Sequence, residues 1–273
     1  MAAISTTRPG LARRVWDLTG RVGLHEIVVV VVAFLIYFAI RGAVVDRAGE
    51  AMVRGIRLIE LEQRFSLYHE LEMQSWILDH FWLIKMMNWV YFWGHMPLVI
   101  GVAAWLYIWH RKAYFVTRNA FLASGAIGVV MYWLFPVAPP RLIPFAGFID
   151  TMAAFDRVGY NAQEAEAFVN PFAAVPSLHF GWSLLLGVVI AWVSRHPLSY
   201  AFAFAWPAAM FFSVVMTGNH FILGAAGNDI IVVRTIPVGA PSMRVSAIVN
   251  PTADIEVTKG ASEILSVGTP AII

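Results

Sequence analysis

The run IVVVVVAFLIYFAI, residues 27–40, decides the fold class of this 273-residue chain. It lies in an apolar stretch from Ile27 to Val45, close to the length of about 20 residues that a membrane-spanning helix needs. Arg41, near its end, can extend its long side chain to the membrane surface. The run is followed by Arg41 and Gly42 rather than by a small-residue cleavage site, so we interpret it as an uncleaved anchor and not as a signal peptide.

The composition agrees with a membrane protein. Hydrophobic residues make up 59% of the chain and charged residues 13%, whereas soluble domains average about 45–50% and about 25%. Lys and Arg (19) nearly balance Asp and Glu (17), which does not favour a nucleic-acid partner. Cys is absent, so disulfides, iron–sulfur clusters and thiol nucleophiles are excluded.

Further apolar runs predict an all-α, polytopic bundle with five clear membrane spans. Between the first and second spans, residues 50–80 mix charges with apolar residues at helical spacing. This pattern predicts an amphipathic helix on the membrane surface, broken near Ser66. The four later spans are predicted at 86–109, 115–135, 177–193 and 198–216.

Arginine and lysine are concentrated in alternate connecting segments. They occur before the first span, between the second and third spans, and between the fourth and fifth. Because such loops usually face the cytoplasm, the N-terminus is predicted to lie inside a multi-pass cell-membrane protein. The Pro-rich loop 136–176 then lies on the outer face.

Three motifs at the outer span ends carry candidate chemistry. In FPVAPPRLIP, residues 135–144, Arg141 follows a stiff turn and could clamp a phosphate or anchor the chain at the interface. In NPFAAVPSLHF, residues 170–180, Ser177 is a natural N-cap. His179 follows in the first helical turn, either as a proton donor and acceptor or as an interfacial histidine.

The third motif, TGNHFILG, spans residues 217–224. His220 is either a nucleophile toward phosphorus, which would form a phosphohistidine, or a surface histidine. Together with Arg141 and His179 it would make a set for phosphoryl transfer without a metal or cofactor.

Two further groups of polar residues have open roles. Asn88, Tyr91 and His95 share one face of the second span and could form a headgroup pocket or structural interhelical bonds. Asp150 and Asp156 could orient a catalytic histidine or simply be solvated. No nucleotide-binding loop or metal-spaced cluster is present in the sequence.

The chain resembles the type 2 phosphatidic acid phosphatase superfamily, and within it the bacterial branch grouped with inositol phosphorylceramide synthases. The resemblance covers about residues 25–224, between an N-terminal segment, 1–24, and an atypical non-spanning tail, 225–273. The matching segments are FPVAPPRLIP, GFIDT (147–151), NPFAAVPSLHFGWS (170–183), TGNH (217–220), LEQRFSLYHELEMQ (61–74) and the set Asn88, Tyr91, His95 and Pro97.

The resemblance implies a six-helix bundle with an extracytoplasmic active site that acts on a membrane lipid, either a phospholipid or an isoprenoid phosphate. By this resemblance His220 attacks phosphorus and His179 protonates the leaving group. Ser177 and Arg141 hold the phosphate.

The sequence departs from the superfamily pattern in the first and the third motif. In KxxxxxxRP, Leu134 and Leu142 replace Lys and Pro, and in SRxxxxxHxxxD, Val214 replaces Arg. These differences fit the inositol phosphorylceramide synthase branch.

The most serious departure is Gly224, which stands where an acid would orient His220. Asp229 is nine positions from His220, half a helical turn out of register, and cannot replace that acid on a regular helix. Loss of an orienting acid costs about 10⁴-fold in a serine triad. Impaired catalysis is therefore expected, or a catalytically inactive member that binds phospholipid or a membrane partner.

The sixth span is also degraded after Gly224. We formulate two hypotheses for the segment that follows: a frameshift, truncation or recombination, or a natural variant.

Overall fold

The computed structural model describes residues 21–45, 47–155 and 170–226, and within these ranges the chain is all-α, as predicted. An isolated parallel β-bridge between Val137 and Ala173 is the one extended pairing in the described ranges. Most of the predicted segments 1–24 and 225–273, together with Asp156 and Asp229, lie outside the described residues.

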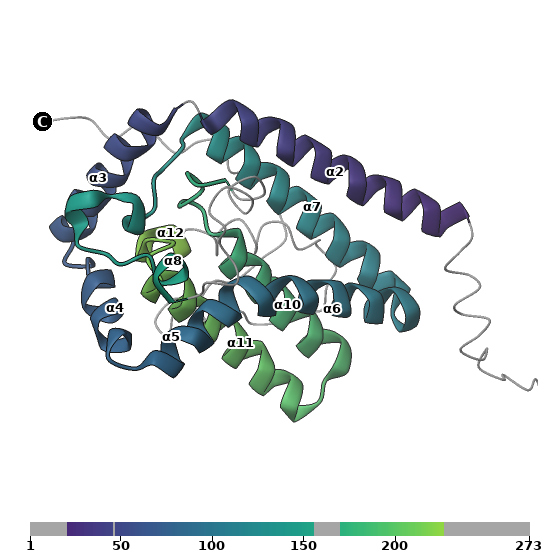
Figure 1. Cartoon of the computed structure of the whole chain (residues 1–273). Coiled ribbons are helices and arrows are strands. Elements are labelled where there is room, and N and C mark those ends of the chain that lie inside the picture. Colours follow the sequence, from purple (N-terminus) through teal and green to yellow (C-terminus); the bar gives the residue numbers. More distant parts are fainter. Residues whose placement is uncertain (1–20, 46, 156–169, 227–273) are drawn as a thin grey trace, which may run out of the picture. The chain divides into compact units, whose positions relative to one another are not determined.

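Figure 1 shows the helices of the described ranges. In chain order they are α2 (Arg21–Val45), α3 (Ala48–Arg64), α4 (Glu70–Leu78), α5 (Phe81–Asn88), the π-helical turn η1 (Trp89–Gly94), α6 (His95–Trp109), α7 (Arg111–Leu134), the 3-10 turns η2 (Pro140–Leu142) and η3 (Pro144–Ala146), α8 (Thr151–Phe155), α10 (Leu178–Ser194), α11 (Pro197–Met216) and α12 (Ile222–Ala226).

Within the described residues, three helical stretches are long and apolar enough to cross a membrane: the continuous stretch Phe81–Trp109, α7 and α11. They correspond to the predicted second, third and fifth spans. The second begins at Phe81 and not at 86, because the residues before Met86 continue the helix. Two shorter apolar segments correspond to the first and fourth spans: Gly23–Ala33, which is part of α2, and helix α10. The count of five spans is not confirmed, and these two stay predictions.

The predicted break near Ser66 is confirmed. Helix α3 ends at Arg64, Ser66 has a positive φ of 55°, and α4 begins at Glu70. One side of α3 is buried, and the placement of this helix on a membrane surface stays a prediction. The buried residues of that side are Ala51, Gly55, Ile59 and Glu62.

Close helix pairs hold the apolar stretches together. Helices α10 and α11 approach so closely that a Cβ on Gly187 would lie 2.7 Å from the carbonyl oxygen of Ala203. A small residue at such a crossing allows backbone-to-backbone packing. Helix α2 lies along α7 (Figure 1), where Nη1 of Arg118 donates to a carboxylate oxygen of Glu26 at 2.6 Å.

Candidate active site

The loops that carry the three sequence motifs are hydrogen-bonded to one another through their backbones. The N–H of Val137 donates to the carbonyl of Phe172 at 3.0 Å, and the N–H of Ala174 donates back to the carbonyl of Val137 at 3.2 Å. The N–H of Arg141 donates to the carbonyl of Gly218 at 3.0 Å. Segments more than thirty residues apart in sequence therefore form one unit.

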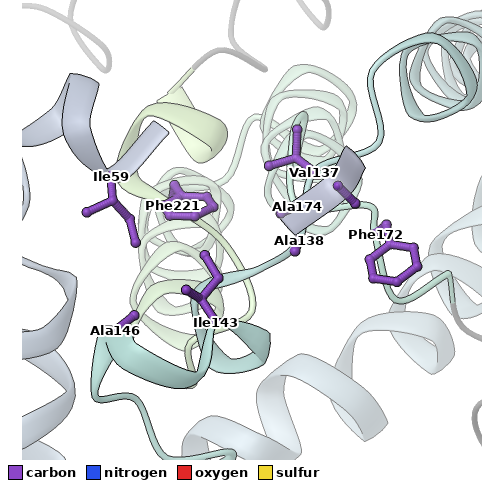
Figure 2. Packing of buried hydrophobic residues seen from close by; sticks show 9 residues of the cluster. Ile59, Val137, Ala138, Ile143, Ala146, Phe172, Ala174 and Phe221 are labelled. Carbon is purple, nitrogen blue, oxygen red and sulfur yellow. The ribbon is translucent and has the colours of Figure 1, made fainter. Parts of the chain in front are cut away.

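A shared apolar cluster supports these loops (Figure 2). Phe221, which follows His220, is fully buried in it, and Ile59 joins it from α3. Burial of such side chains stabilises a fold by about 1.5–3 kcal/mol each. The cluster thus fixes the backbone on both sides of the candidate site. Its other buried members are Ala51, Val137, Ala138, Ile143, Ala146, Phe172 and Ala174.

His220 lies just beyond the end of α11 and is almost fully buried, with 4% of its surface exposed. Its Nδ1 is 2.9 Å from the carbonyl oxygen of Ala174. A carbonyl can only accept, so Nδ1 carries the proton and Nε2 keeps a lone pair. Burial lowers the pKa of His220 to about 4, the positive charge of Arg141 adds to this effect, and the hydrogen bond to Ala174 opposes it. The imidazole is therefore neutral at neutral pH.

Gly224, the position of the missing acid, contacts the same carbonyl. A Cβ added at Gly224 would lie 2.8 Å from the carbonyl oxygen of Ala174 and 2.9 Å from Cγ2 of Val175. The carbonyl oxygen of Gly224 also accepts from the N–H of Ser177 at 3.2 Å. The acid that the family pattern expects at 224 is absent, and the backbone carbonyl of Ala174 orients the ring of His220 instead, in space that glycine leaves open.

His179 approaches His220 from the start of α10. As predicted, Ser177 caps this helix: its Oγ accepts from the N–H of Phe180 at 3.4 Å. His179 lies in the first turn, and its ring centroid is 6.3 Å from that of His220. The second and third motifs therefore bring their histidines together.

Arg141 is fixed by two side chains on different segments. Its Nε donates to Oδ1 of Asn219 at 2.8 Å, and its Nη1 donates to Oδ2 of Asp150 at 2.8 Å. The other oxygen of Asp150 accepts from the N–H groups of Met152 and Ala153 at the start of α8. Asp150 therefore pairs with an arginine, and among the described residues no hydrogen bond connects it to a catalytic histidine, while its side chain stays partly exposed.

The predicted headgroup residues fall into two groups. The ring centroids of Tyr91 and His95 lie 4.5 Å and 5.1 Å from that of His179, so both residues line the same space. Asn88, by contrast, exchanges two hydrogen bonds with Thr151, which fits the structural alternative.

Sequence reasoning missed two buried carboxyl groups, Glu62 and Glu70, which it counted among the charges of a surface helix. Both are 0% exposed and accept hydrogen bonds from the backbone directly after His220. A signal was present, because Ile59 and Glu62 are three residues apart and so share one side of α3. Within the described ranges, no group of three or more His, Cys, Asp or Glu side chains is placed to hold a metal ion.

Comparison with known families gives one match. The model of the PAP2 superfamily matches residues 56–237, a range that includes all three motifs and both buried glutamates. No curated protein and no solved structure matches the chain significantly.

Proposed function

We propose that this chain, which belongs to the PAP2 superfamily, is an integral-membrane phosphatase or phosphotransferase that acts on lipid phosphate groups. Membership of this superfamily suggests the reaction class. The three long apolar helical stretches suggest a membrane protein, and hence a substrate that resides in the membrane.

The hydrogen bond between His220 and Ala174 is the observation that carries the proposal. It leaves the lone pair on Nε2 of a buried, neutral imidazole, which is the form that attacks an electrophile. His179 is close enough to exchange a proton with a group bound between the two rings. Arg141 supplies positive charge at the same place, which favours a phosphate.

The proposed reaction proceeds in two balanced steps. In the first, Nε2 of His220 forms a bond to phosphorus, the bond from phosphorus to the ester oxygen breaks, and protonated His179 gives its proton to that oxygen. In the second, His179 takes a proton from water or from an alcohol, whose oxygen forms a bond to phosphorus while the bond from phosphorus to Nε2 breaks and frees His220. Arg141 and the capping Ser177 would hold the phosphate through both steps.

The lipid class and the side of the membrane belong to the proposal as well. We propose a phospholipid or isoprenoid phosphate substrate, with Tyr91 and His95 lining the pocket for its headgroup beside His179. Similarity to the inositol phosphorylceramide synthase branch favours transfer to an alcohol over hydrolysis. The positive-inside pattern favours a site on the extracytoplasmic face of the cell membrane.

An inactive, lipid-binding role was suggested by Gly224 and by the degraded sixth span. The carbonyl of Ala174 supplies a hydrogen bond to His220 where the missing acid would have made one, so Gly224 no longer favours this alternative.

The proposal is tested with the purified full chain in detergent. Phosphatidic acid, phosphatidylinositol and a polyprenyl phosphate are offered separately, with and without an alcohol acceptor, and released or transferred phosphate is measured. We expect activity on at least one of them, with His179→Ala lowering it at least 10²-fold. His80→Ala is the matched control, since His80 is exposed and bonds only to the carbonyl of Trp76. Equal activity in all three proteins, or none in the wild type, would overturn the proposal.

A further inference from the structure

Glu62 and Glu70 bring two acidic side chains into the interior directly behind His220. Glu62 lies in the last turns of α3 and Glu70 begins α4, and the turn at Ser66 folds one helix end back toward the other. Both glutamates are 0% exposed. Buried carboxyl groups are costly unless their oxygens are hydrogen-bonded, so their arrangement requires a physical reason.

One oxygen of each carboxyl group holds the backbone that follows the candidate nucleophile. Oε1 of Glu70 accepts from the N–H of Ile222 at 2.8 Å, and Oε1 of Glu62 accepts from the N–H of Leu223 at 2.8 Å. These two residues follow Phe221, which is itself locked into the apolar cluster next to Ile59 (Figure 2). The segment after His220 is thereby fixed by two hydrogen bonds to buried carboxyl groups and by one buried ring.

The second oxygens of the two groups accept no hydrogen bond from any other residue in the described ranges. Two neighbouring carboxylates cannot both be charged in a buried place, and the stable arrangement is one proton shared between them. Burial and then the neighbouring carboxyl group of Glu70 raise the pKa of Glu62 to about 9, although the bond from Leu223 opposes the shift. Glu62 is therefore protonated at neutral pH, and Glu70 is the group with which it can share the proton.

The surroundings of the pair contain no compensating charge among the described residues. Glu70 is the charged group that acts on Glu62, and α12 presents backbone N–H groups to both. Tyr68, in the turn between the helices, has its pKa raised by burial and by the two carboxyl groups. Arg141 acts on the imidazole of His220.

We propose that Glu62 and Glu70 are a proton-sharing carboxyl pair that positions His220 by holding the first turn of α12. The pair does not touch the reacting atoms: both members are positioning residues, and the proposal rests on the proposed function for the role of His220. If the pair shares a proton, the activity of the site depends on a proton that lies between Glu62 and Glu70 and is not transferred in the reaction.

The pair predicts a loss of activity at alkaline pH. Because the pKa of Glu62 is raised in the folded protein, the fold is stabilised by the protonated form of Glu62. This stabilisation is present at neutral pH and is lost as the pH rises through about 9. Glu62 then loses its proton, its charge is repelled by the neighbouring carboxyl group of Glu70, and the backbone at Ile222 and Leu223 is released. We expect kcat to fall above about pH 9 while KM changes less than about twofold.

Two substitutions of Glu62 distinguish the effect of the shared proton from the effect of side-chain packing. In Glu62→Gln the amide N–H replaces the shared proton, and the amide oxygen still accepts from the N–H of Leu223. We therefore expect kcat at pH 7 to stay within about threefold of the wild type. The loss of activity at alkaline pH should disappear. Glu62→Leu leaves that N–H unpaired and should lower kcat about tenfold or more. Glu60→Gln, at an exposed position of α3, should change neither quantity.

Two readouts do not depend on activity. Infrared spectra of the full chain in an ester-free detergent should contain the carbonyl band of a protonated carboxylic acid at pH 7. This band should be lost at pH 10 and absent in Glu62→Gln. Hydrogen exchange in the peptide containing Ile222 and Leu223 should accelerate in Glu62→Leu and stay slow in Glu62→Gln.

A band that persists unchanged in Glu62→Gln would overturn the inference, as would equal exchange in all variants or an alkaline loss that Glu62→Gln retains. Should the wild type show no phosphoryl transfer, the proposed function fails, and the band and the exchange rates still decide whether the pair exists.

Discussion

At the scale of single residues, the hydrogen bond from His220 to the carbonyl of Ala174 determines how the candidate nucleophile presents itself. A carbonyl orients the ring and selects its tautomer as a carboxylate would, and it carries only a partial charge. The ring stays neutral and nucleophilic because burial, aided by the charge of Arg141, lowers the pKa of His220 to about 4, although the bond to Ala174 opposes this shift.

Restoring the family's acid should damage this site. A Cβ at Gly224 would press on the carbonyl of Ala174 at 2.8 Å, so Gly224→Asp and Gly224→Ala should both displace the hydrogen-bond partner of His220. We expect each to lower kcat at least about tenfold and to lower the unfolding temperature, because overpacking costs about 1–3 kcal/mol. Turnover and thermal unfolding in detergent measure both effects.

Gly101→Ala is the control for these variants, since a Cβ there has nothing within 4 Å. A gain of activity in Gly224→Asp would contradict the role assigned to the Ala174 carbonyl.

Asp150 and Asn219 should tune phosphate binding through Arg141. Asp150→Asn keeps the size of the side chain and an oxygen for the N–H groups of α8, but removes the negative charge that fixes Nη1 of Arg141. We expect KM to change several-fold and kcat to change less, in steady-state measurements on the lipid substrate. A fall in kcat with constant KM would instead place Asp150 in the chemical step.

Part of this site follows from the sequence, and part does not. Arg141, Ser177, His179 and His220 were identifiable because their side chains have the right chemistry at the ends of apolar runs. The carbonyl of Ala174 was not identifiable, because every residue has a carbonyl and only the fold decides which one faces His220.

At the scale of helices, hydropathy predicted the long elements and capping predicted one boundary. Ser177 begins α10 because its side chain accepts the N–H of Phe180. The π-helical turn η1 depends on neighbouring segments, so no local pattern predicts it. For Glu62 the spacing from Ile59 was a local signal, whereas the burial of Glu70 follows from the contacts that α4 makes in the fold.

The contact between α10 and α11 offers an element-scale prediction. A Cβ on Gly187 would lie 2.7 Å from the carbonyl oxygen of Ala203, a backbone atom that cannot rotate away. Gly187→Ala should therefore force the helices apart and lower the unfolding temperature, by an amount that corresponds to about 1–3 kcal/mol. Thermal unfolding in detergent measures it, with Gly101→Ala again as the control. Equal unfolding temperatures for the two variants would refute the close packing.

At the scale of the whole molecule, the chain combines three candidate spans with a site built from the loops between helices. Residues distant in sequence meet there because backbone hydrogen bonds and one apolar cluster join their loops. Hydropathy predicts which segments are apolar. It does not predict which loops contact one another, because those contacts depend on the folded structure.

The proposed orientation can be tested because the chain contains no Cys. Phe145→Cys lies in the loop that carries Arg141 and is highly exposed, and Lys112→Cys lies at the opposite end of α7. With the site outside, an impermeant thiol reagent on intact cells should label Phe145→Cys at once and Lys112→Cys only after permeabilisation. The reverse pattern would place the site on the cytoplasmic side.

A nucleophilic His220 becomes covalently phosphorylated during turnover, and trapping the phosphoenzyme detects this intermediate. The purified chain is mixed briefly with a lipid substrate that carries ³²P in its phosphate and is then denatured in alkali, in which phosphohistidine survives. We predict an acid-labile label on the peptide that contains His220, present in His80→Ala and absent in His220→Ala. Turnover without any such label, or a label that persists in His220→Ala, would contradict the account.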